Sequence, residues 1–456
     1  MTTTLSALDR LGVRVHGAAA PLLGLALRRN PKRAQLLVSR VLGKHIPTDP
    51  RLVRAAGLLL GRLVADALAD RPRRPLPTAL LRRAVDGDRD AAAALPRDAI
   101  DDVTDFDGAL VLGFAETATA LGHCVAEGLG GAPYLHSTRR PVPGVATAGG
   151  FTEEHSHATE HLLLPHDPAL LTDGRPLVLV DDELSTGRTV LNTITALHRV
   201  APRKRYVVAA LVDVRSADGD PADGELADGV RALGARLDVV SLARGTVELP
   251  ADVIARAAGI RAELDPAGLD PAGPRPARKQ NPTRAHASRV ELAALGWPDG
   301  LPAGGRHGFS RGDHAALAAA LPGLGAALAH AVDLRPGGRT LVLGTEELMA
   351  LPLRLAQTLA DAGHDIAFST TTRSPAVVVD EPGYALRSGI SFPAHDDPAD
   401  GPGDRFAYNV APHSDGAAWD HVLVVVDPPA DTPLLYAGLL TELGPHTRRL
   451  SLVVSP

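Results

Sequence analysis

Residues 177–189 read LVLVDDELSTGRT, and this stretch decides the fold expected for the chain. The four apolar residues 177–180 follow a glycine and a proline, a pattern that predicts a short buried strand. Two adjacent carboxylates, Asp181 and Asp182, come directly after it. A short loop at 183–188 then leads into a pattern typical of a helix with one apolar face. The stretch therefore predicts a strand, an acidic tip and a helix in succession.

The loop after the acidic tip is suited to binding a phosphate group. Ser185, Thr186 and Thr189 supply hydroxyl groups, and Gly187 lets the backbone approach a ligand closely. Backbone N–H groups at the start of a helix have no internal partner and lie at the positive end of the helix dipole, so they favour an anion. The two aspartates can accept hydrogen bonds from a vicinal diol and help to hold Mg²⁺. A ribose phosphate would satisfy both requirements; the alternative is an ordinary strand, turn and helix with a solvated acidic tip.

The composition is that of a folded globular protein and excludes several classes. The chain has 456 residues, of which 45% are hydrophobic, so two to four domains are expected. Its formal net charge of −6 argues against a nucleic-acid partner. The single cysteine, Cys124, excludes an internal disulfide framework. No apolar run approaches the roughly 20 residues that span a bilayer, so we expect a soluble cytoplasmic protein with no membrane partner.

The chain divides into four segments by pattern. Residues 1–95 are expected to be mostly helical, because apolar residues recur at helical spacing, for example in 36–42. Residues 96–260 alternate strand and helix patterns, which predicts a parallel sheet with helices on both faces. Residues 261–288 contain five prolines and are expected to form a linker. Residues 289–456 return to α/β patterning and are expected to form a second domain.

The second domain repeats motifs of the first in the same order. The matching pairs are ALVLG at 109–113 with TLVLG at 340–344, STRRP at 137–141 with TTRSP at 371–375, and the strand and aspartate at 177–181 with those at 422–427. We therefore expect a diverged duplication; convergent α/β patterning is the alternative. In the second copy Pro428 and Pro429, which have no N–H to donate, stand where the phosphate cradle would be. A second site of the same kind is therefore not expected.

The stretch at 177–189 resembles the PRPP-binding motif of type I phosphoribosyltransferases, in which an apolar strand, two acids and a spacer precede Thr-Gly-x-Thr. Across nearly its whole length the chain is similar to the phosphoribosyltransferase with a C-terminal TRSP domain that occurs in tellurite-resistance (ter) gene clusters. The other residues that carry this resemblance are NPKRAQLLVSRVLGKHIPTDP at 30–50, GFAETATALG at 113–122, STRRPV at 137–142, EEHSHATEH at 153–161 and TTRSP at 371–375.

The resemblance implies a type I phosphoribosyltransferase-like fold and an enzyme that uses PRPP and Mg²⁺ to ribosylate an unidentified base-like acceptor, with release of pyrophosphate. It also implies a place in a stress-linked biosynthetic module. Asp181 and Asp182 would hold the ribose hydroxyls and influence Mg²⁺. The remaining PRPP-binding residues would be Glu183, Ser185, Thr186, Gly187, Arg188 and Thr189. The alternative functions are a regulatory protein that binds PRPP without turnover and a metal-dependent hydrolase. A homodimer is a possible assembly.

In this family the turn after the first core strand binds pyrophosphate, and by position that turn is GFAETAT at 113–119. Ala115 and Thr117 are small enough for close approach of the backbone. Glu116 departs from the pattern, because a carboxylate repels pyrophosphate unless Mg²⁺ lies between them. It is either a metal or substrate contact or a solvated glutamate at a helix start.

The long loop at 137–160 is expected to be a mobile lid, because prolines and glycines gather near its start. Arg139 and Arg140 could neutralise the departing pyrophosphate, or form a surface pair. Further along the loop three residues alternate, so an extended backbone would place them on one face. They are Glu153, His155 and His157. They are candidates for a second metal site or for acid–base groups, and the metal-dependent hydrolase alternative is centred on them. The other interpretation is a polar loop with incidental histidines.

Two further sets of charged residues allow two interpretations each. Six basic residues and no acid lie between residues 28 and 44, which favours a solvated basic helix face over a phosphate or RNA contact. In the second domain four polar residues occupy strand-end positions analogous to those of the first copy. They are Glu346, Glu347, Arg373 and Ser374, and a structural role is favoured over binding.

Overall fold

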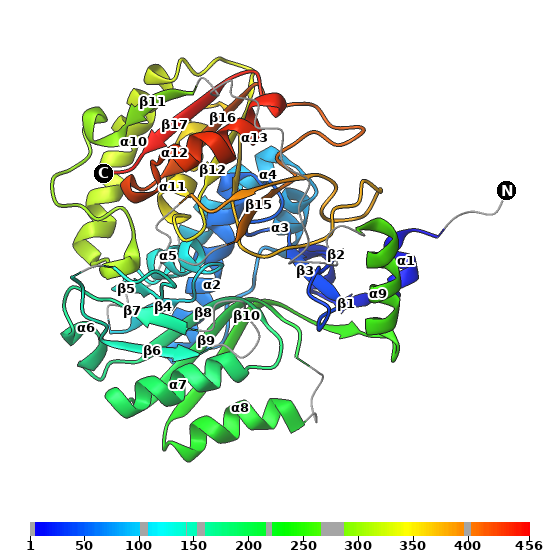
Figure 1. The fold of residues 1–456 in the computed structure, drawn as a ribbon. Coiled ribbons are helices and arrows are strands. Elements are labelled where there is room, and N and C mark those ends of the chain that lie inside the picture. The colour runs from blue at the N-terminus through cyan, green and yellow to red at the C-terminus, as the bar shows by residue number, and fades with distance from the viewer. Residues whose placement is uncertain are drawn as a thin grey trace.

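The computed structural model describes residues 5–100, 108–142, 144–152, 160–215, 221–265, 287–395 and 403–456. Its body consists of two open sheets with helices between and outside them (Figure 1). This confirms an α/β protein with a second parallel sheet in the C-terminal region.

The first sheet is parallel apart from one edge strand. In spatial order its strands are β1 (Arg14–Gly17), β10 (Arg236–Glu248), β9 (Arg205–Asp213), β8 (Leu177–Leu184), β4 (Leu110–Gly113) and β5 (Tyr134–His136). β1 runs antiparallel to β10, and the other neighbours are parallel. The strand predicted at 177–180 is confirmed, and all four of its side chains are buried.

β8 is longer than the sequence predicts, and the expected loop at 183–188 is shorter. Glu183 pairs with Val212 of β9, and Leu184 pairs with Asp213. The Leu184 side chain is buried, which favours continuation of the strand beyond the two aspartates. The acidic residues therefore lie on the strand itself, and the loop consists of residues 185–187.

The second sheet is parallel throughout. In spatial order its strands are β11 (Ser288–Glu291), β17 (Leu450–Val454), β16 (His421–Val426), β12 (Arg339–Gly344) and β13 (Asp365–Thr370). Three antiparallel pairs accompany the two sheets: β2 (Leu23–Leu27) with β3 (Gln35–Ser39), β6 (Gly149–Thr152) with β7 (Glu160–Leu163), and β14 (Gly389–Pro393) with β15 (Asp404–Tyr408).

Helices lie between the two sheets and on the outer face of each sheet. Between the sheets lie α2 (Pro50–Leu68), α5 (Thr119–Gly128), α10 (Arg311–Ala331) and α11 (Ala350–Asp361), and one continuous apolar core joins them to the inner faces of both sheets. The outer face of the first sheet is covered by α7 (Arg188–Val200) and α8 (Pro221–Ala232), and that of the second by α12 (Pro433–Leu435), α13 (Thr441–Leu443) and the β14–β15 pair. These outer helices lie at opposite ends of the view in Figure 1.

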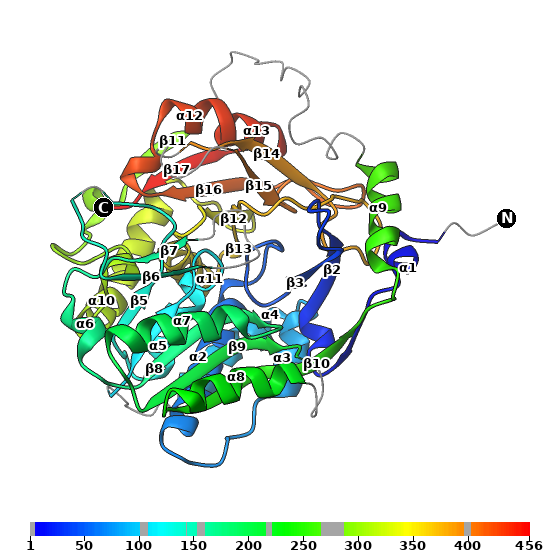
Figure 2. The ribbon, with the colours of Figure 1, turned by 60° about the horizontal axis from the view of Figure 1, so that its bottom comes forward.

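The N-terminal region is only partly helical. The helices α2, α3 (Thr78–Val85) and α4 (Arg89–Ile100) confirm the expectation for the later part, but residues 23–39 form the β2–β3 hairpin instead of a helix. Side chains along β3 alternate, with Leu36 and Val38 buried, so the apolar residues follow the two-residue period of a strand. The hairpin packs with α1 (Ala7–Leu11), α9 (Val253–Leu264) and residues of the second domain in a separate core (Figure 2).

Two other sequence expectations concern connecting segments. Of the predicted linker, residues 261–264 belong to α9, and residues 266–286 lie outside the described residues. Helix α10 is long and apolar enough, by length and composition, to cross a membrane, with a third of its apolar window buried. It packs against α11 through leucines of the shared core. Length and composition alone are weak support for a membrane span, and the expected absence of one stays a prediction.

The carboxyl ends of the two sheets meet, and the loops there repeat the same hydrogen bonds. In the first domain, Ser137 N–H donates to the Gly113 carbonyl at 3.0 Å, and its hydroxyl accepts from the Ala115 N–H at 2.9 Å. In the second domain, Thr371 N–H donates to the Gly344 carbonyl at 3.0 Å, and its hydroxyl accepts from the Glu346 N–H at 3.1 Å. These equivalent bonds fall on the motif pairs that the sequence repeats.

Candidate active site

The predicted site lies where the order of the first sheet reverses. From β4 the chain goes to β5 on one side and then to β8 on the other. Ligands of open α/β sheets bind outside the carboxyl ends of the strands at such a point. Gly113 pairs with Val180, and the Phe114 N–H donates to the Val180 carbonyl at 3.1 Å. The turn that follows β4 and the carboxylates of β8 therefore start side by side.

Three consecutive carboxylates form the acidic end of β8. Asp181, Asp182 and Glu183 are all partly buried, and the Asp182 N–H donates to Asp181 Oδ1 at 2.9 Å. Burial and the neighbouring Asp182 raise the pKa of Glu183 to about 7, against the opposing effect of Arg28 and Arg33. Mg²⁺ is usually bound through one or two carboxylates together with phosphate oxygens of the substrate. The residues present therefore fit the expected metal.

The loop between β8 and α7 offers an anion site. Ser185, Thr186 and Arg188 are exposed, and Gly187 adopts a left-handed conformation with φ of 74°. Such a conformation is strained for residues with a Cβ, which explains the glycine. Helix α7 begins at Arg188, whose N–H donates to the Thr186 hydroxyl of the loop at 3.4 Å. Its first N–H groups and the hydroxyls of the loop can thus face a phosphate group.

Glu116, in the turn after β4, is neither solvated nor unpaired. Its carboxylate is 6% exposed and lies 3.4 Å from Lys44 Nζ and 3.1 Å from Arg373 Nε. The hydroxyl of Thr372 also donates to it at 3.4 Å. The interpretation as a solvated glutamate is therefore wrong. Two cations offset the charge that would otherwise repel pyrophosphate from this turn.

The flanking residues of the turn are held in place as well. Ala115 is buried, and Thr117 accepts a hydrogen bond from Lys44 Nζ at 2.9 Å. A Cβ on Gly113 would approach the Ala118 carbonyl oxygen to 2.6 Å and the Tyr134 hydroxyl to 2.7 Å. Glycine is required there because the turn folds back tightly onto β4.

Arg139 and Arg140 contact the second domain. The Arg139 N–H donates to Glu347 Oε1 at 2.8 Å, and its guanidinium lies 3.5 Å from His161 Nε2. Arg140 forms ion pairs with Glu346 at 3.8 Å and with Asp427 at 3.7 Å. The interpretation as a surface pair is therefore wrong. Both arginines lie at the junction of the two sheets.

Comparison with known families identifies both parts of the chain. Residues 22–246 match a family model described as phosphoribosyl transferase, and residues 303–443 match one described as the TRSP domain C-terminal to it. The chain is a phosphoribosyltransferase-family protein with a C-terminal TRSP domain. The resemblance inferred from the sequence motifs is thereby confirmed. The phosphoribosyltransferase match begins before β2, so it includes the hairpin and the helices α2 to α4.

Among solved structures, three similar proteins are adenine phosphoribosyltransferases. The Trypanosoma brucei protein, in complex with AMP, pyrophosphate and ribose-5-phosphate, is 17% identical, with a TM-score of 0.24 over 34% of this chain and 68% of that one. The Rhodothermus marinus protein is 15% identical, with a TM-score of 0.27 over 52% and 97%. The Giardia lamblia protein, complexed with 9-deazaadenine, is 22% identical, with a TM-score of 0.21 over 40% and 97%. Such low scores carry no information on the acceptor, and no curated protein matches the chain.

The sequence-predicted histidine site is not placed. Glu153, His155 and His157 lie outside the described residues, so a metal there stays a prediction. In the described part of the chain, potential metal ligands lie close together in two separate groups. The first is His123, Glu127 and His314, and the second is Asp380, His413 and Asp415. Guanidinium groups of Arg54 and Arg354 contact Glu127 in the first group, and Arg387 contacts both aspartates of the second. Their positive charge opposes a bound cation in either group.

Lys44 and Arg373 were named from the sequence, but neither of them was linked to the turn after β4. Lys44 belongs to the acid-free run at 28–44, and this absence of acids was the available signal. The preferred interpretation of that run as a solvated helix face is wrong, because Lys44 is buried and Arg40 donates to the carbonyls of Pro21 and Val85. Arg373 belongs to the TRSP domain yet contacts the turn of the phosphoribosyltransferase domain. The first site is therefore completed by both domains.

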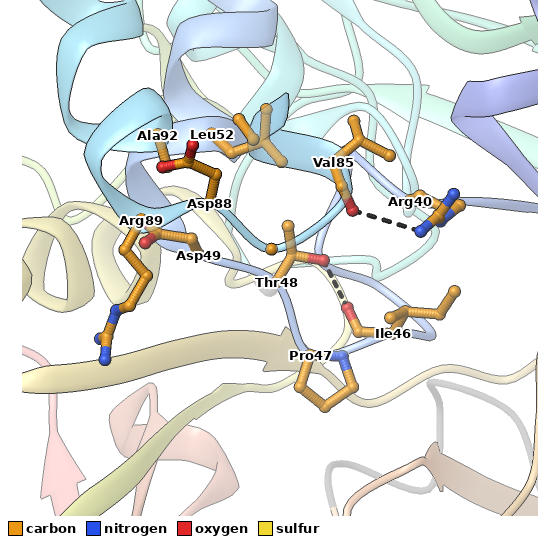
Figure 3. Close-up of a pocket in the computed structure, with 12 residues that line it drawn as sticks. Arg40, Ile46, Pro47, Thr48, Asp49, Leu52, Val85, Asp88, Arg89 and Ala92 are labelled. Atoms are coloured by element: carbon orange, nitrogen blue, oxygen red, sulfur yellow. Dashed lines mark hydrogen bonds between the residues drawn. The ribbon is translucent and has the colours of Figure 1, made fainter. Parts of the chain in front are cut away.

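A small pocket lies between residues 46–49 and the helices α3 and α4 (Figure 3). Its volume is about 160 Å³, below the roughly 300 Å³ at which small-molecule sites begin. The Thr48 hydroxyl donates to the Ile46 carbonyl at 2.8 Å, and Arg40 donates to the Val85 carbonyl at 3.2 Å. The lining residues include none of the predicted site residues, so we assign the pocket no function.

Proposed function

We propose that the protein transfers the 5-phosphoribosyl group of PRPP to a base-like acceptor and releases pyrophosphate. The observation that carries this proposal is the pairing of Gly113 with Val180. It sets the turn 114–117 beside the three carboxylates of β8, one short loop away from the start of α7. This arrangement offers separate places for a pyrophosphate, a ribose diol and a 5′-phosphate.

The reaction breaks the bond between C1 of the ribose and the pyrophosphate oxygen, and the electron pair leaves with pyrophosphate. A nitrogen of the acceptor forms the new bond to C1 and gives up its proton to solvent or a base. Asp181 and Asp182 would accept from the ribose hydroxyls, and residues 185–189 would bind the 5′-phosphate. Mg²⁺, when bound beside these carboxylates, would supply positive charge for the leaving pyrophosphate.

The leaving group also needs positive charge from the protein. We propose that Lys44 supplies it, because its Nζ lies within hydrogen-bonding distance of the turn 115–117. Arg373 would assist by pairing with Glu116 at 3.1 Å, while it also pairs with Glu346 at 2.5 Å. Arg139 and Arg140 were the sequence-based candidates for this task. Their contacts with Glu347, Glu346 and Asp427 favour a role at the domain junction instead.

The test is Mg²⁺-dependent pyrophosphate release from PRPP with a panel of purine and pyrimidine bases. The wild type should release pyrophosphate with at least one base, and Asp182→Asn should not, because its side chain loses the charge that orients the diol and the metal. Asp173→Asn is the matched control, since Asp173 lies in the same domain in a local ion pair with Arg175. Release that survives in Asp182→Asn would remove the assignment.

A binding measurement separates the enzyme from a regulatory protein that only senses PRPP. Ligand at about 100 times its dissociation constant stabilises the folded state by roughly 2.7 kcal/mol. A Mg²⁺-dependent rise in melting temperature with PRPP, lost in Asp182→Asn and unaccompanied by pyrophosphate release, would favour the sensor.

We further propose that the protein acts in a stress-linked biosynthetic module that makes a nucleotide-like metabolite, and that its two halves arose by duplication. The TRSP match and the repeated hydrogen bonds at Ser137 and Thr371 support these two statements. Deletion of the coding gene should lower tolerance to tellurite. Unchanged tolerance would separate the protein from that module.

A further inference from the structure

A cavity of about 670 Å³ opens at the carboxyl end of the second sheet. Its walls include Glu347 after β12, Asp427 after β16 and Ser455 after β17, together with Arg140 and Arg306. The volume falls within the range of roughly 300–1,000 Å³ that small-molecule sites occupy. The cavity is therefore large enough for a molecule of nucleotide size.

The cavity lies at the point where the order of the second sheet reverses. From β12 the chain goes to β13 on one side and later to β16 on the other, so the crevice opens between the ends of β12 and β16. This is the position at which open α/β sheets bind their ligands. It is also equivalent to the crevice between β4 and β8 in the first sheet, although the prolines after Asp427 remove the phosphate cradle found there.

Two guanidinium groups and two carboxylates face one another across this crevice. Arg140 and Arg306 each approach Asp427 Oδ2 at 3.7 Å, and Arg306 lies 3.3 Å from Glu347 Oε2. The Nε of Arg306 has no hydrogen-bond partner among the described residues, so this guanidinium can take an additional acceptor. Helix α11 begins beside them at Ala350, without a side-chain cap, and adds the positive end of its dipole.

Two buried polar atoms on the wall have no hydrogen-bond partner among the described residues. Ser455 is 4% exposed and its hydroxyl is unpartnered, as is Nε of Arg306. Buried polar groups are nearly always satisfied, so such atoms in a cavity wall indicate a missing partner. The remaining wall includes Val142, Leu301 and Met349, which offer an apolar surface for a flat ring.

We propose that this cavity binds a second, phosphate-bearing ligand of nucleotide size. Its phosphate would contact Arg140, Arg306 and the N–H of Ala350 at the start of α11. Its donor groups would face Asp427, and Ser455 would bond to a polar atom of the sugar or base. This binding does not require PRPP turnover at the first site.

Isothermal titration calorimetry on the full chain tests the proposal with three probes: AMP, ribose 5-phosphate and inorganic pyrophosphate. At least one should bind the wild type, and Arg306→Gln should weaken it about tenfold or more, the loss expected when one charge-assisted contact is removed. In Asp182→Asn, which impairs the first site, the binding that depends on Arg306 should remain. Arg335→Gln is the matched control, because Arg335 lies on the surface of the same domain in an exposed ion pair with Asp333.

The three probes also distinguish the sources of the phosphate. Tighter binding of AMP than of ribose 5-phosphate would place a base on the apolar wall, and tighter binding of pyrophosphate would identify the reaction product as the ligand. If Arg306→Gln melts at a lower temperature without ligand, Ser455→Ala decides, since it removes only the unpartnered hydroxyl and should weaken binding severalfold.

Three results would overturn the proposal. They are no binding of any probe, binding lost in Asp182→Asn but kept in Arg306→Gln, and full affinity in Ser455→Ala. Binding that depends on Arg306 in a protein that releases no pyrophosphate would remove the proposed enzyme function and leave this second site in place.

Discussion

Glu347 is a buried carboxylate at which the two domains meet, and its ionisation should stabilise their contact. Its side chain accepts from the Thr138 hydroxyl at 2.6 Å and from the Arg139 N–H at 2.8 Å, and it lies 3.3 Å from Arg306. Burial by itself would raise the pKa of Glu347, but Arg306, Arg140 and the other donors lower it to about 2. We predict that Glu347→Gln, which keeps the shape and removes the charge, loosens the junction.

The size of the effect follows from the pKa. The difference between the ordinary value of 4.5 and about 2 corresponds to roughly 3 kcal/mol, at about 1.36 kcal/mol per pKa unit. Because the folded-state pKa lies below the ordinary value, the ionised carboxylate stabilises the folded chain at pH 7. This contribution is fully present above pH 4.5 and is lost as the pH falls towards 2.

The assay is hydrogen exchange of the Arg139 amide, because that N–H is bonded directly to Glu347. A chain with several cores need not unfold in one step, so a local probe is preferable to a global one. At pH 7 the amide should exchange faster in Glu347→Gln, on the order of a hundredfold. Glu291→Gln is the matched control, since that glutamate is exposed on the same domain.

The pH dependence separates the charge from mere packing. Wild type and Glu347→Gln, compared at the same pH, should converge as the pH falls below 4.5. Unchanged protection of Arg139 at pH 7 would refute the reasoning. So would a difference that stays constant down to pH 3.

Three shorter predictions address other parts of the molecule. Gly113→Ala should abolish pyrophosphate release and lower the melting temperature, because the added Cβ would approach the Ala118 carbonyl oxygen to 2.6 Å. Gly259→Ala is the control and should do neither, because nothing lies within 4 Å of its Cβ. Normal activity in Gly113→Ala would contradict the tight turn. Burial raises the pKa of Cys124 to about 12, so no thiol of the native protein should react with a disulfide reagent at pH 8. One thiol should react after denaturation. Rapid reaction of the native protein would show that α5 opens. Elemental analysis of the purified protein should show no stoichiometric Zn²⁺, Mn²⁺ or Fe. If the protein instead contains one equivalent of such a metal, and the double variant His155→Ala/His157→Ala lacks it, the metal-dependent hydrolase is favoured.

Local features of the fold could be predicted from the sequence. The strand at 177–180 was predictable because four apolar residues in a row suit a strand that is covered on both faces, and all four are buried. The hairpin at 23–39 was not, because apolar residues such as Leu36, Leu37 and Val41 fit a helical period as well as a strand. Only pairing with Leu23–Leu27 decides between them. The end of β8 was missed for the same reason, since Glu183 and Leu184 depend on partners in β9.

The charged contacts of the site could not be predicted, because they join residues far apart in the sequence. Lys44 and Glu116 are separated by 72 positions, and Thr372 and Glu116 by 256. A carboxylate in a pyrophosphate-binding turn looks unfavourable until its cations are known. The sequence contained both partners in recognisable motifs, the acid-free run around Lys44 and the TTRSP motif, but no periodicity links them to the turn.

The contacts at the junction imply that neither site belongs to one domain. Arg373 of the TRSP domain offsets the charge of Glu116 beside the first site, and Arg140 of the phosphoribosyltransferase domain lines the second cavity. Reciprocal bonds tie the same loops together, because Thr138 donates to Glu347 while Thr372 donates to Glu116. A ligand that displaces Arg140 or Arg306 from the acids of the second cavity would therefore act on the loop that carries Thr138 and Arg139. Since that loop hydrogen-bonds to Ala115 through Ser137, occupancy of one crevice is coupled by direct contacts to the turn of the other.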